Sequence, residues 1–319
     1  MNRELATKVA NAVLYEGYML YPYRPSAIEN RQRWSFGILY PPKYDEVKGG
    51  TERSGMHSEC LLKLTGETVV HVQLRFLHLL SKEVLRAVDG HLEPAASVIV
   101  DGELVEPWDE GVERCEEFDV LPSDELEQFF QFSFDGLNDS EPMRDVNGQV
   151  GAELTCSQDD IQGTILISCE LLRNDVMKLS IDVENTTPLP SYTTDRDTVL
   201  LSSFLSAHLI LAAEGAEFVS LLDPPDEFRE DIKACNNIGN FPVLVGGEGE
   251  RDMLLCSPIV LYDYPQVAPE SAGDFYDATE MRSGDNRVRR RLQRTEESER
   301  EQLTKSHGTI RSMRPASEQ

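Results

Sequence analysis

Hydrophobic and polar residues alternate along much of the chain, and this period-two pattern predicts a body built mainly of strands. The clearest case is the pair of runs at residues 163–172 and 176–183, which flank Arg173-Asn174-Asp175 and predict a β-hairpin. A second hairpin is predicted at residues 98–105, because Asp101-Gly102 between β-branched runs supplies the positive φ angles of a tight turn.

A third hairpin is expected where the apolar runs 59–64 and 68–80 flank Thr65-Gly66-Glu67. Further strands are predicted at residues 35–40, 112–121, 150–156, 241–245 and 253–261. Another is predicted at residues 128–134, although residues 124–132 could instead form a short helix.

Two stretches have helical spacing instead. Residues 4–21 carry apolar side chains on one face and end before Pro22, which favours an amphipathic helix. A second helix is predicted from Asp195 or Asp197, either of which can cap it, to about Ala213. His208 is placed on the apolar face of that helix.

These elements predict an α+β fold with an antiparallel meander or sandwich-like body, a few helices and a helical C-terminal tail. Residues 1–34 would form an N-terminal helix and a segment rich in Tyr and Arg. Residues 35–281 would form the α+β body, and residues 282–319 a basic, partly ordered helical tail.

The chain is strongly acidic, with 30 Lys and Arg against 57 Asp and Glu and a formal net charge of −27. That charge repels nucleic-acid phosphates and anionic membranes and favours a basic protein patch or a cation. The alternative is that the charge serves solubility alone. The basic tail is either a solvated helix or an arm that docks on an acidic surface of this protein or of a partner.

The cysteines and the N-terminal pattern indicate a cytoplasmic protein. No two of the six Cys have C-x-x-C spacing, which is typical of reduced, mostly buried thiols. Arg3, Glu4, Lys8 and Glu16 interrupt the first apolar stretch, so the uncharged core of a signal peptide is missing. No run approaches the ~18 apolar residues of a membrane helix, and we expect no membrane insertion.

The densest group of candidate binding residues follows the first helix. It consists of Tyr21, Tyr23, Arg24, Arg31, Arg33 and Trp34, with Tyr262 and Tyr264 as a second aromatic group near the end of the body. Tyr, Trp and Arg are enriched at the centres of protein interfaces. The alternatives are that the tyrosines belong to the core, or that the three arginines clamp a small anionic ligand.

Signals for a metal site or a catalytic site are weak. His57-Ser58-Glu59-Cys60 offers one pair of zinc ligands, whereas a structural zinc site uses four. There is no G-x-S-x-G motif, although a distant Cys–His pair stays open. The glycine-rich stretch 246–251 contains two Glu and is expected to be a surface hairpin loop. We predict no metal, no cofactor and no catalytic residue.

Three stretches resemble a bacterial family whose genes often lie beside those of high-affinity uptake NiFe hydrogenases. They are Ala12–Tyr18 with Tyr21–Arg24 and Asn30–Gly37, then Val183–Pro188, and finally Ser257–Ser271. The chain lacks a helical segment that the relatives carry just after the position of Thr279-Glu280.

The resemblance implies a role near hydrogenase assembly, maturation or electron transfer, and it gives no reaction. A cysteine framework for iron–sulfur clusters is missing, which favours an accessory or assembly protein over an electron carrier. The hypothesis is a non-catalytic protein that binds hydrogenase subunits or maturation factors. The alternative is an enzyme or binding protein for a small anionic ligand that uses Arg24, Arg31 and Arg33.

Overall fold

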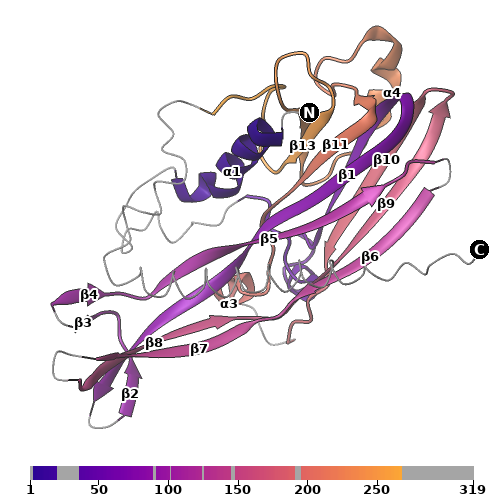
Figure 1. Ribbon diagram of the computed structural model, residues 1–319. Coiled ribbons are helices and arrows are strands. Elements are labelled where there is room, and N and C mark those ends of the chain that lie inside the picture. Colours follow the sequence, from indigo (N-terminus) through magenta and orange to yellow (C-terminus); the bar gives the residue numbers. More distant parts are fainter. Residues whose placement is uncertain are drawn as a thin grey trace, which may run out of the picture. The chain divides into compact units, whose positions relative to one another are not determined.

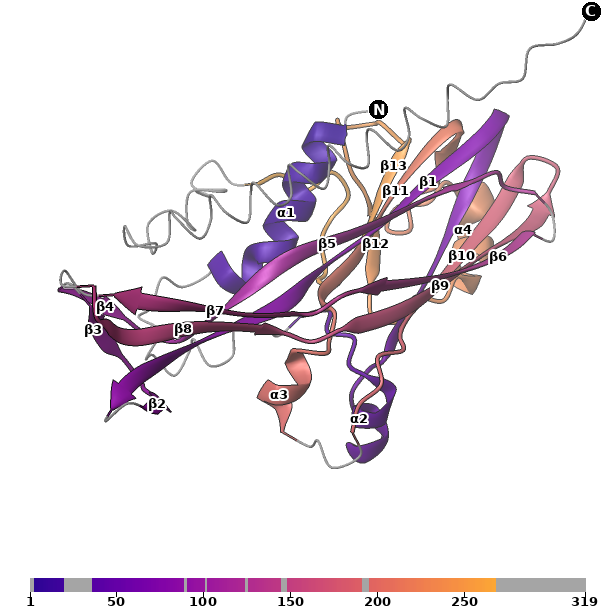
Figure 2. The same cartoon turned by 60° about the horizontal axis from the view of Figure 1, so that its bottom comes forward.

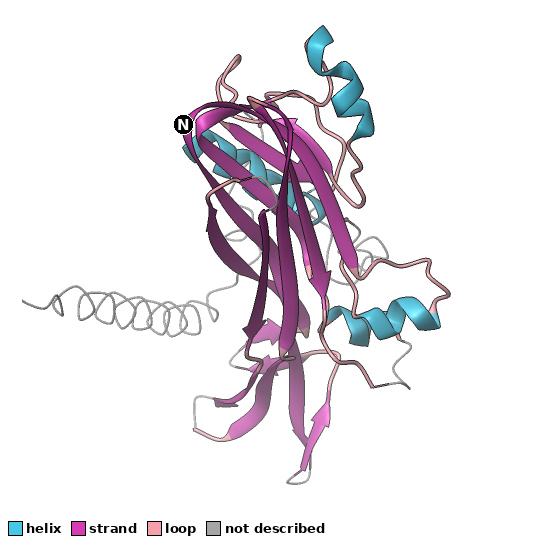
Figure 3. Cartoon of the chain, turned by 90° about the vertical axis from the view of Figure 1, so that its right-hand side faces the viewer, coloured by secondary structure: helices cyan, strands magenta, loops and turns pink. Residues whose placement is uncertain are grey.

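The computed structural model describes residues 3–19, 36–88, 91–100, 102–123, 126–144, 148–190 and 195–267. The helices are α1 (Arg3–Met19), α2 (Pro42–Val47), α3 (Arg196–Leu200), α4 (Arg229–Ala234) and the 3-10 helix η2 (Asp226–Phe228). The strands are β1 (Gly55–Val88), β2 (His91–Pro94), β3 (Val98–Val100), β4 (Glu103–Val105), β5 (Trp108–Val120), β6 (Leu126–Phe134), β7 (Leu137–Arg144), β8 (Val150–Gln158), β9 (Ile161–Arg173), β10 (Val176–Asn185), β11 (Leu205–Phe218), β12 (Phe241–Leu244) and β13 (Met253–Ser257). Strands dominate this part of the chain, and the helices lie at its periphery (Figure 3).

The 34-residue strand β1 organises the sheet, because it pairs with five other strands along its length. β10 and β11 pair with its first half and middle, and β5, β8 and β2 follow toward its end. All these pairings are antiparallel, and the order on one side continues as β1-β10-β9-β6 (Figure 1). The body is therefore a mainly antiparallel β structure with few helices, as the sequence predicts.

β1 bends at residues 65–68. Leu64 pairs with Ala216 and Val69 with Glu214, so four residues of β1 bulge opposite the single residue Gly215. Gly215 has a φ of 70°, and a Cβ there would lie 2.0 Å from the carbonyl oxygen of Glu67. The hairpin predicted around Gly66 is wrong, because one neighbouring strand holds both sides of the bulge and β1 continues in the same direction.

The bend folds the sheet over its own core. Phe118 of β5 and Phe130 of β6 have ring centroids 4.7 Å apart although their strands are not paired with each other. Phe76 of β1 stacks on Phe204 with centroids 4.4 Å apart. Both rings are fully buried, and burying a side chain of this size stabilises a fold by about 1.5–3 kcal/mol.

Two predicted hairpins are confirmed. β9 and β10 pair around Asn174 and Asp175, and one face of β9 lies in the core, which explains its clear alternation. β3 and β4 pair in the second hairpin, where Gly102 has a φ of 82°. The glycine-rich stretch after β12 is the loop of a third hairpin, which joins β12 to β13.

The predicted helix from Asp195 to Ala213 is wrong beyond its first turns. Asp195 does cap α3, because its Oδ2 accepts from the Thr198 amide at 3.0 Å. The chain then enters β11, which is buried on both faces. One face lies in the main core and the other packs beneath α1. A strand covered on both sides reads as a continuous apolar run, so its sequence has no period to distinguish it from a helix.

α1 packs along β11 and β13 (Figure 2). The strand predicted at residues 35–40 is also wrong, since it reduces to a single bridge between Leu39 and Phe204.

The predicted tail at 282–319 lies outside the described residues. In the part of the chain that the structure describes, no helix has the length and hydrophobicity required to cross a membrane.

Candidate functional site

The densest polar cluster lies on the outer face of β1 and β10. The register places His57 opposite Asp182 and Glu59 opposite Ser180, with Lys178 two pairs further along and therefore on the same face. The intervening residues Ser58 and Cys60 point to the opposite face of the strand, as strand geometry requires. The hypothetical zinc pair of His57 and Cys60 is therefore split between two faces of β1.

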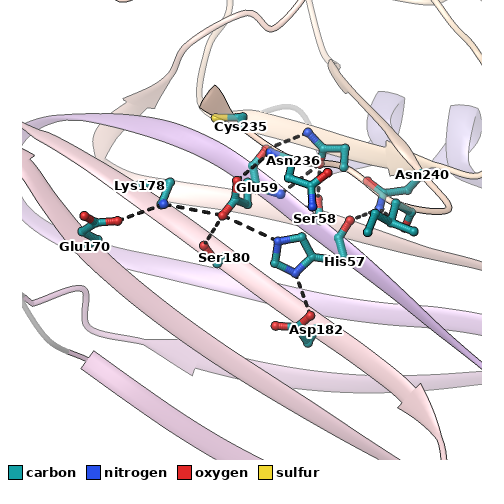
Figure 4. Close-up of polar contacts among 12 residues, drawn as sticks. His57, Ser58, Glu59, Glu170, Lys178, Ser180, Asp182, Cys235, Asn236 and Asn240 are labelled. Atoms are coloured by element: carbon teal, nitrogen blue, oxygen red, sulfur yellow. Dashed lines mark hydrogen bonds and ion pairs between the residues drawn. The ribbon is translucent and has the colours of Figure 1, made fainter. Parts of the chain in front are cut away.

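Glu59 is the centre of this cluster (Figure 4). Its Oε2 accepts from the Asn236 amide at 2.6 Å, and its Oε1 accepts from Ser180 Oγ at 3.3 Å. Lys178 Nζ lies 3.5 Å from Glu59 Oε1 and 2.9 Å from Glu170 Oε2. The His57 ring bridges two carboxylates, with Nδ1 at 2.6 Å from Asp182 Oδ1 and Nε2 at 3.6 Å from Glu59 Oε1.

These partners keep the buried Glu59 ionised. Burial raises its pKa, but the Asn236 amide, Lys178 and His57 together outweigh that effect and lower the pKa below its ordinary value. The hydrogen bond to Glu170 raises the pKa of Lys178 in turn. The cluster is thus a connected set of polar and charged groups in which Lys178 lies between the carboxylates of Glu59 and Glu170.

The cluster holds the segment 236–240 on the free side of β1. Ile238 forms two backbone hydrogen bonds with His57, at 3.0 and 2.8 Å. Asn240 Nδ2 donates to the His57 carbonyl at 2.8 Å, and the Glu59 amide donates to Asn237 Oδ1 at 2.9 Å. The Ser180 hydroxyl is directed at Glu59, and no hydroxyl or thiol of the described residues is hydrogen-bonded to the His57 ring. This geometry fixes a loop rather than activating a nucleophile.

The six cysteines share one electrostatic feature. Burial raises the pKa of all six thiols, to about 11 for Cys115, Cys169 and Cys235 and to about 12 for Cys256. A reactive cysteine needs a lowered pKa, since the thiolate is the nucleophile. The raised pKa values give no sign of a reactive thiol among the described residues, and a pair that involves His307 lies outside them.

The predicted binding residues fall into two groups. Tyr21, Tyr23, Arg24, Arg31, Arg33 and Trp34 lie outside the described residues, so an interface or an anion clamp built from them stays a prediction. Tyr262 and Tyr264 lie on the segment Pro258–Val267, which we call the strap. The surroundings of the two residues differ, because Tyr264 packs against the main core whereas Tyr262 is 87% exposed.

Backbone and side-chain bonds fix the strap in place. The Tyr264 amide donates to the Leu244 carbonyl at 2.8 Å, and the Leu244 amide donates to Asp263 Oδ1 at 2.8 Å. Ser220 Oγ donates to the other oxygen of Asp263 at 2.5 Å. Ile259, Leu261 and Val267 pack onto the cluster beneath α1. Val260, 72% exposed, and Tyr262 face solvent.

The strap also lies against Gly37, which follows the Tyr- and Arg-rich segment in the sequence. A Cβ on Gly37, whose φ is 55°, would lie 2.6 Å from Cβ of Pro258. The preceding Phe36 is 41% exposed. Gly37 and Pro258, about 220 positions apart in the sequence, therefore lie side by side in the structure.

Sequence reasoning missed the cluster around Glu59. Its signal is present in part, because alternation on β10 already places Lys178, Ser180 and Asp182 on one face. The missing information is that β1, more than 100 residues earlier, is the neighbour of β10.

Comparisons with known proteins give no relative that bears on function. No protein-family model matches the chain, and no curated protein matches it. Among solved structures, a chain of the Salmonella SPI-1 type III secretion injectisome secretin InvG in the open gate state aligns at 10% sequence identity and a TM-score of 0.17. The alignment covers 89% of this chain and 88% of that chain. A score this low supports no conclusion about fold or function.

Proposed function

We propose that the protein is a non-catalytic accessory protein that binds another protein through the strap and the Tyr- and Arg-rich segment. The observation that carries this proposal is the strap itself. It is fixed by Asp263 and Tyr264 while it exposes the apolar side chains Val260 and Tyr262. An anchor held in place before binding loses little conformational freedom when the partner arrives.

Charge and residue type support the same proposal. The net charge of −27 favours a partner with a basic patch. Tyrosine is enriched at interface hot spots, because it buries much area and keeps a polar end. The family resemblance implies that a NiFe hydrogenase subunit or maturation factor is the partner, and we include that identity in the proposal.

The test is co-purification from the native host while it expresses the hydrogenase, with bound proteins identified by mass spectrometry. The variant Tyr262→Ala combined with Val260→Ala removes both exposed anchors and leaves the buried strap contacts in place. We expect it to lower recovery of hydrogenase proteins at least tenfold, since truncation of one hot spot costs about 2 kcal/mol or more. Combined alanine substitution of Arg24, Arg33 and Trp34 should have the same effect.

Ile99→Ala is the matched control, because Ile99 is 73% exposed on β3, far from the strap in sequence. Circular dichroism and thermal melting must be the same for all variants. Equal recovery of hydrogenase proteins with wild type and strap variants would reject the surface. Absence of hydrogenase proteins from the wild-type sample would reject the partner.

A further inference from the structure

A small pocket lies where the end of β11 meets β1 and the 3-10 helix η2. η2 leads into α4, which lies beside β1 (Figure 1). The volume of the pocket is about 150 Å³, and a cavity of about that size accommodates a molecule such as benzene. Drug-sized ligands occupy pockets of about 300–1,000 Å³. The pocket therefore fits only a small molecule.

Charged side chains of both signs line this pocket. Lys63 and Arg251 are basic, and Glu217 and Glu227 are acidic. Lys63 and Glu217 lie opposite each other on β1 and β11, so their side chains project from the same face of the sheet. Within the described part of the chain, none of these four side chains forms an ion pair. Two charges of each sign are thus available to a ligand.

Aromatic residues, rather than carboxylates, hold the two basic side chains at the pocket. Lys63 Nζ lies 6.0 Å from the ring centroid of Phe228, at the outer limit of a cation–π contact. Arg251 hydrogen-bonds to the hydroxyl of Tyr264 on the strap, and its carbonyl accepts from the Phe218 amide at 2.7 Å. Neither contact neutralises the charge of the basic side chain.

We propose that this pocket binds a small zwitterion, namely a free α-amino acid with a compact apolar side chain. The ligand carboxylate binds the two basic side chains, the ammonium binds the two acidic ones, and the apolar group packs against Phe218 and Phe228, which also line the pocket. A ligand that displaces water from unpaired charged groups has to pair with them itself. An anion alone leaves the two glutamates without a partner, and a cation alone leaves Lys63 and Arg251 without one. A zwitterion satisfies all four.

The experiment measures binding of free amino acids to the full chain at neutral pH and needs no partner protein. Saturation-transfer difference NMR tests each of the twenty standard amino acids, and calorimetric titration measures the affinity of those that bind. We expect L-leucine or L-valine to bind with a millimolar or tighter dissociation constant. Isocaproate lacks the ammonium of leucine and isoamylamine lacks its carboxylate. Each should bind at least tenfold more weakly than L-leucine, because a site built for a polar group rejects an analogue without it.

Substitutions remove one charge from either end of the pocket. Lys63→Gln and Glu217→Gln should each weaken binding of the amino acid at least tenfold. Lys48→Gln and Glu83→Gln make the same chemical changes at exposed positions outside the pocket and should leave the affinity unchanged. Thermal melting checks that every variant is folded. If Glu217→Gln does not fold, Glu227→Gln on the exposed side of η2 removes the other carboxylate.

Three results would overturn this assignment. The first is the absence of saturable binding by every standard amino acid. The second is isocaproate binding as tightly as L-leucine, which would make the pocket an anion site. The third is an affinity that the folded Lys63 and glutamate variants leave unchanged, which would place the amino acid elsewhere on the protein.

Discussion

Asn185 at the end of β10 is fully buried and joins three separate segments. Its Nδ2 donates to the carbonyls of Leu39 and Ser202 at 2.8 and 2.9 Å. Its Oδ1 accepts from the Thr187 amide at 2.9 Å. One side chain thus connects the stretch that leaves the Tyr- and Arg-rich segment, the end of α3 and the turn after β10.

Asn185→Asp keeps the size of the side chain and removes these donors. A protonated Asp offers one donor at most, and an ionised Asp offers none. The Leu39 carbonyl keeps the Phe204 amide, which donates to it at 3.1 Å. The Ser202 carbonyl loses the Asn185 donor, and leaving a buried carbonyl without its donor costs about 1–3 kcal/mol. That loss is a large part of the roughly 5–15 kcal/mol that holds a domain folded.

The assay is urea unfolding at neutral pH, followed by far-ultraviolet circular dichroism and tryptophan fluorescence. We expect the midpoint to fall by about 0.3–1 M, given a slope of about 3 kcal/mol/M. Asn138→Asp on the exposed strand β7 makes the same chemical change without buried partners and should stay within about 0.5 kcal/mol of wild type. Equal midpoints for the two variants would refute the role assigned to Asn185.

Two further predictions concern packing and pH. Gly163→Ala would place a Cβ 2.3 Å from Cζ of Phe132 and 2.9 Å from Cζ of Phe204, which should cost about 1–3 kcal/mol in thermal unfolding. Gly151→Ala, with open space around its Cβ, should cost less than that and would contradict the reasoning if it matched Gly163→Ala. Burial lowers the pKa of His208 to about 4, against about 6.5 in the unfolded chain. The unfolded state then binds the proton first as the pH falls, so stability is lost between about pH 6.5 and 4. His208→Gln should reduce the slope of unfolding free energy against pH in that window by up to about 1.4 kcal/mol per unit, and an unchanged slope would show that His208 is charged in the folded protein.

The fold could be predicted from the sequence where one face of an element is buried and the other face is exposed to solvent. β9 meets this condition, and its alternation predicts the hairpin with β10 correctly. β11 does not meet it, because both of its faces are covered and its run of Leu, Ile and Ala fits a helix equally well. The sequence of residues 65–68 predicts a turn where the structure has a bulge, because turns and bulges are built from the same polar residues and glycine.

The candidate binding surface could be predicted only as two separate stretches. Residue types single out Tyr262, but the exposure of Tyr262 and the burial of Tyr264 depend on the bond between Tyr264 and Leu244, which no local pattern encodes. The contact of Gly37 with Pro258 is a long-range contact of the same kind. The cluster around Glu59 depends on the register between β1 and β10, and register between distant strands is set by the folded core rather than by either strand.

The central position of β1 has a consequence for how the chain is made. β1 ends at Val88, whereas its neighbour β11 ends only at Phe218. At about 5–20 residues per second, a ribosome takes on the order of ten seconds to cover that interval. Throughout it, a long apolar strand has open edges, and pairings this distant in sequence also form slowly. We therefore expect a fragment that stops short of β11 to leave one edge of β1 unpaired and to aggregate rather than form a smaller domain.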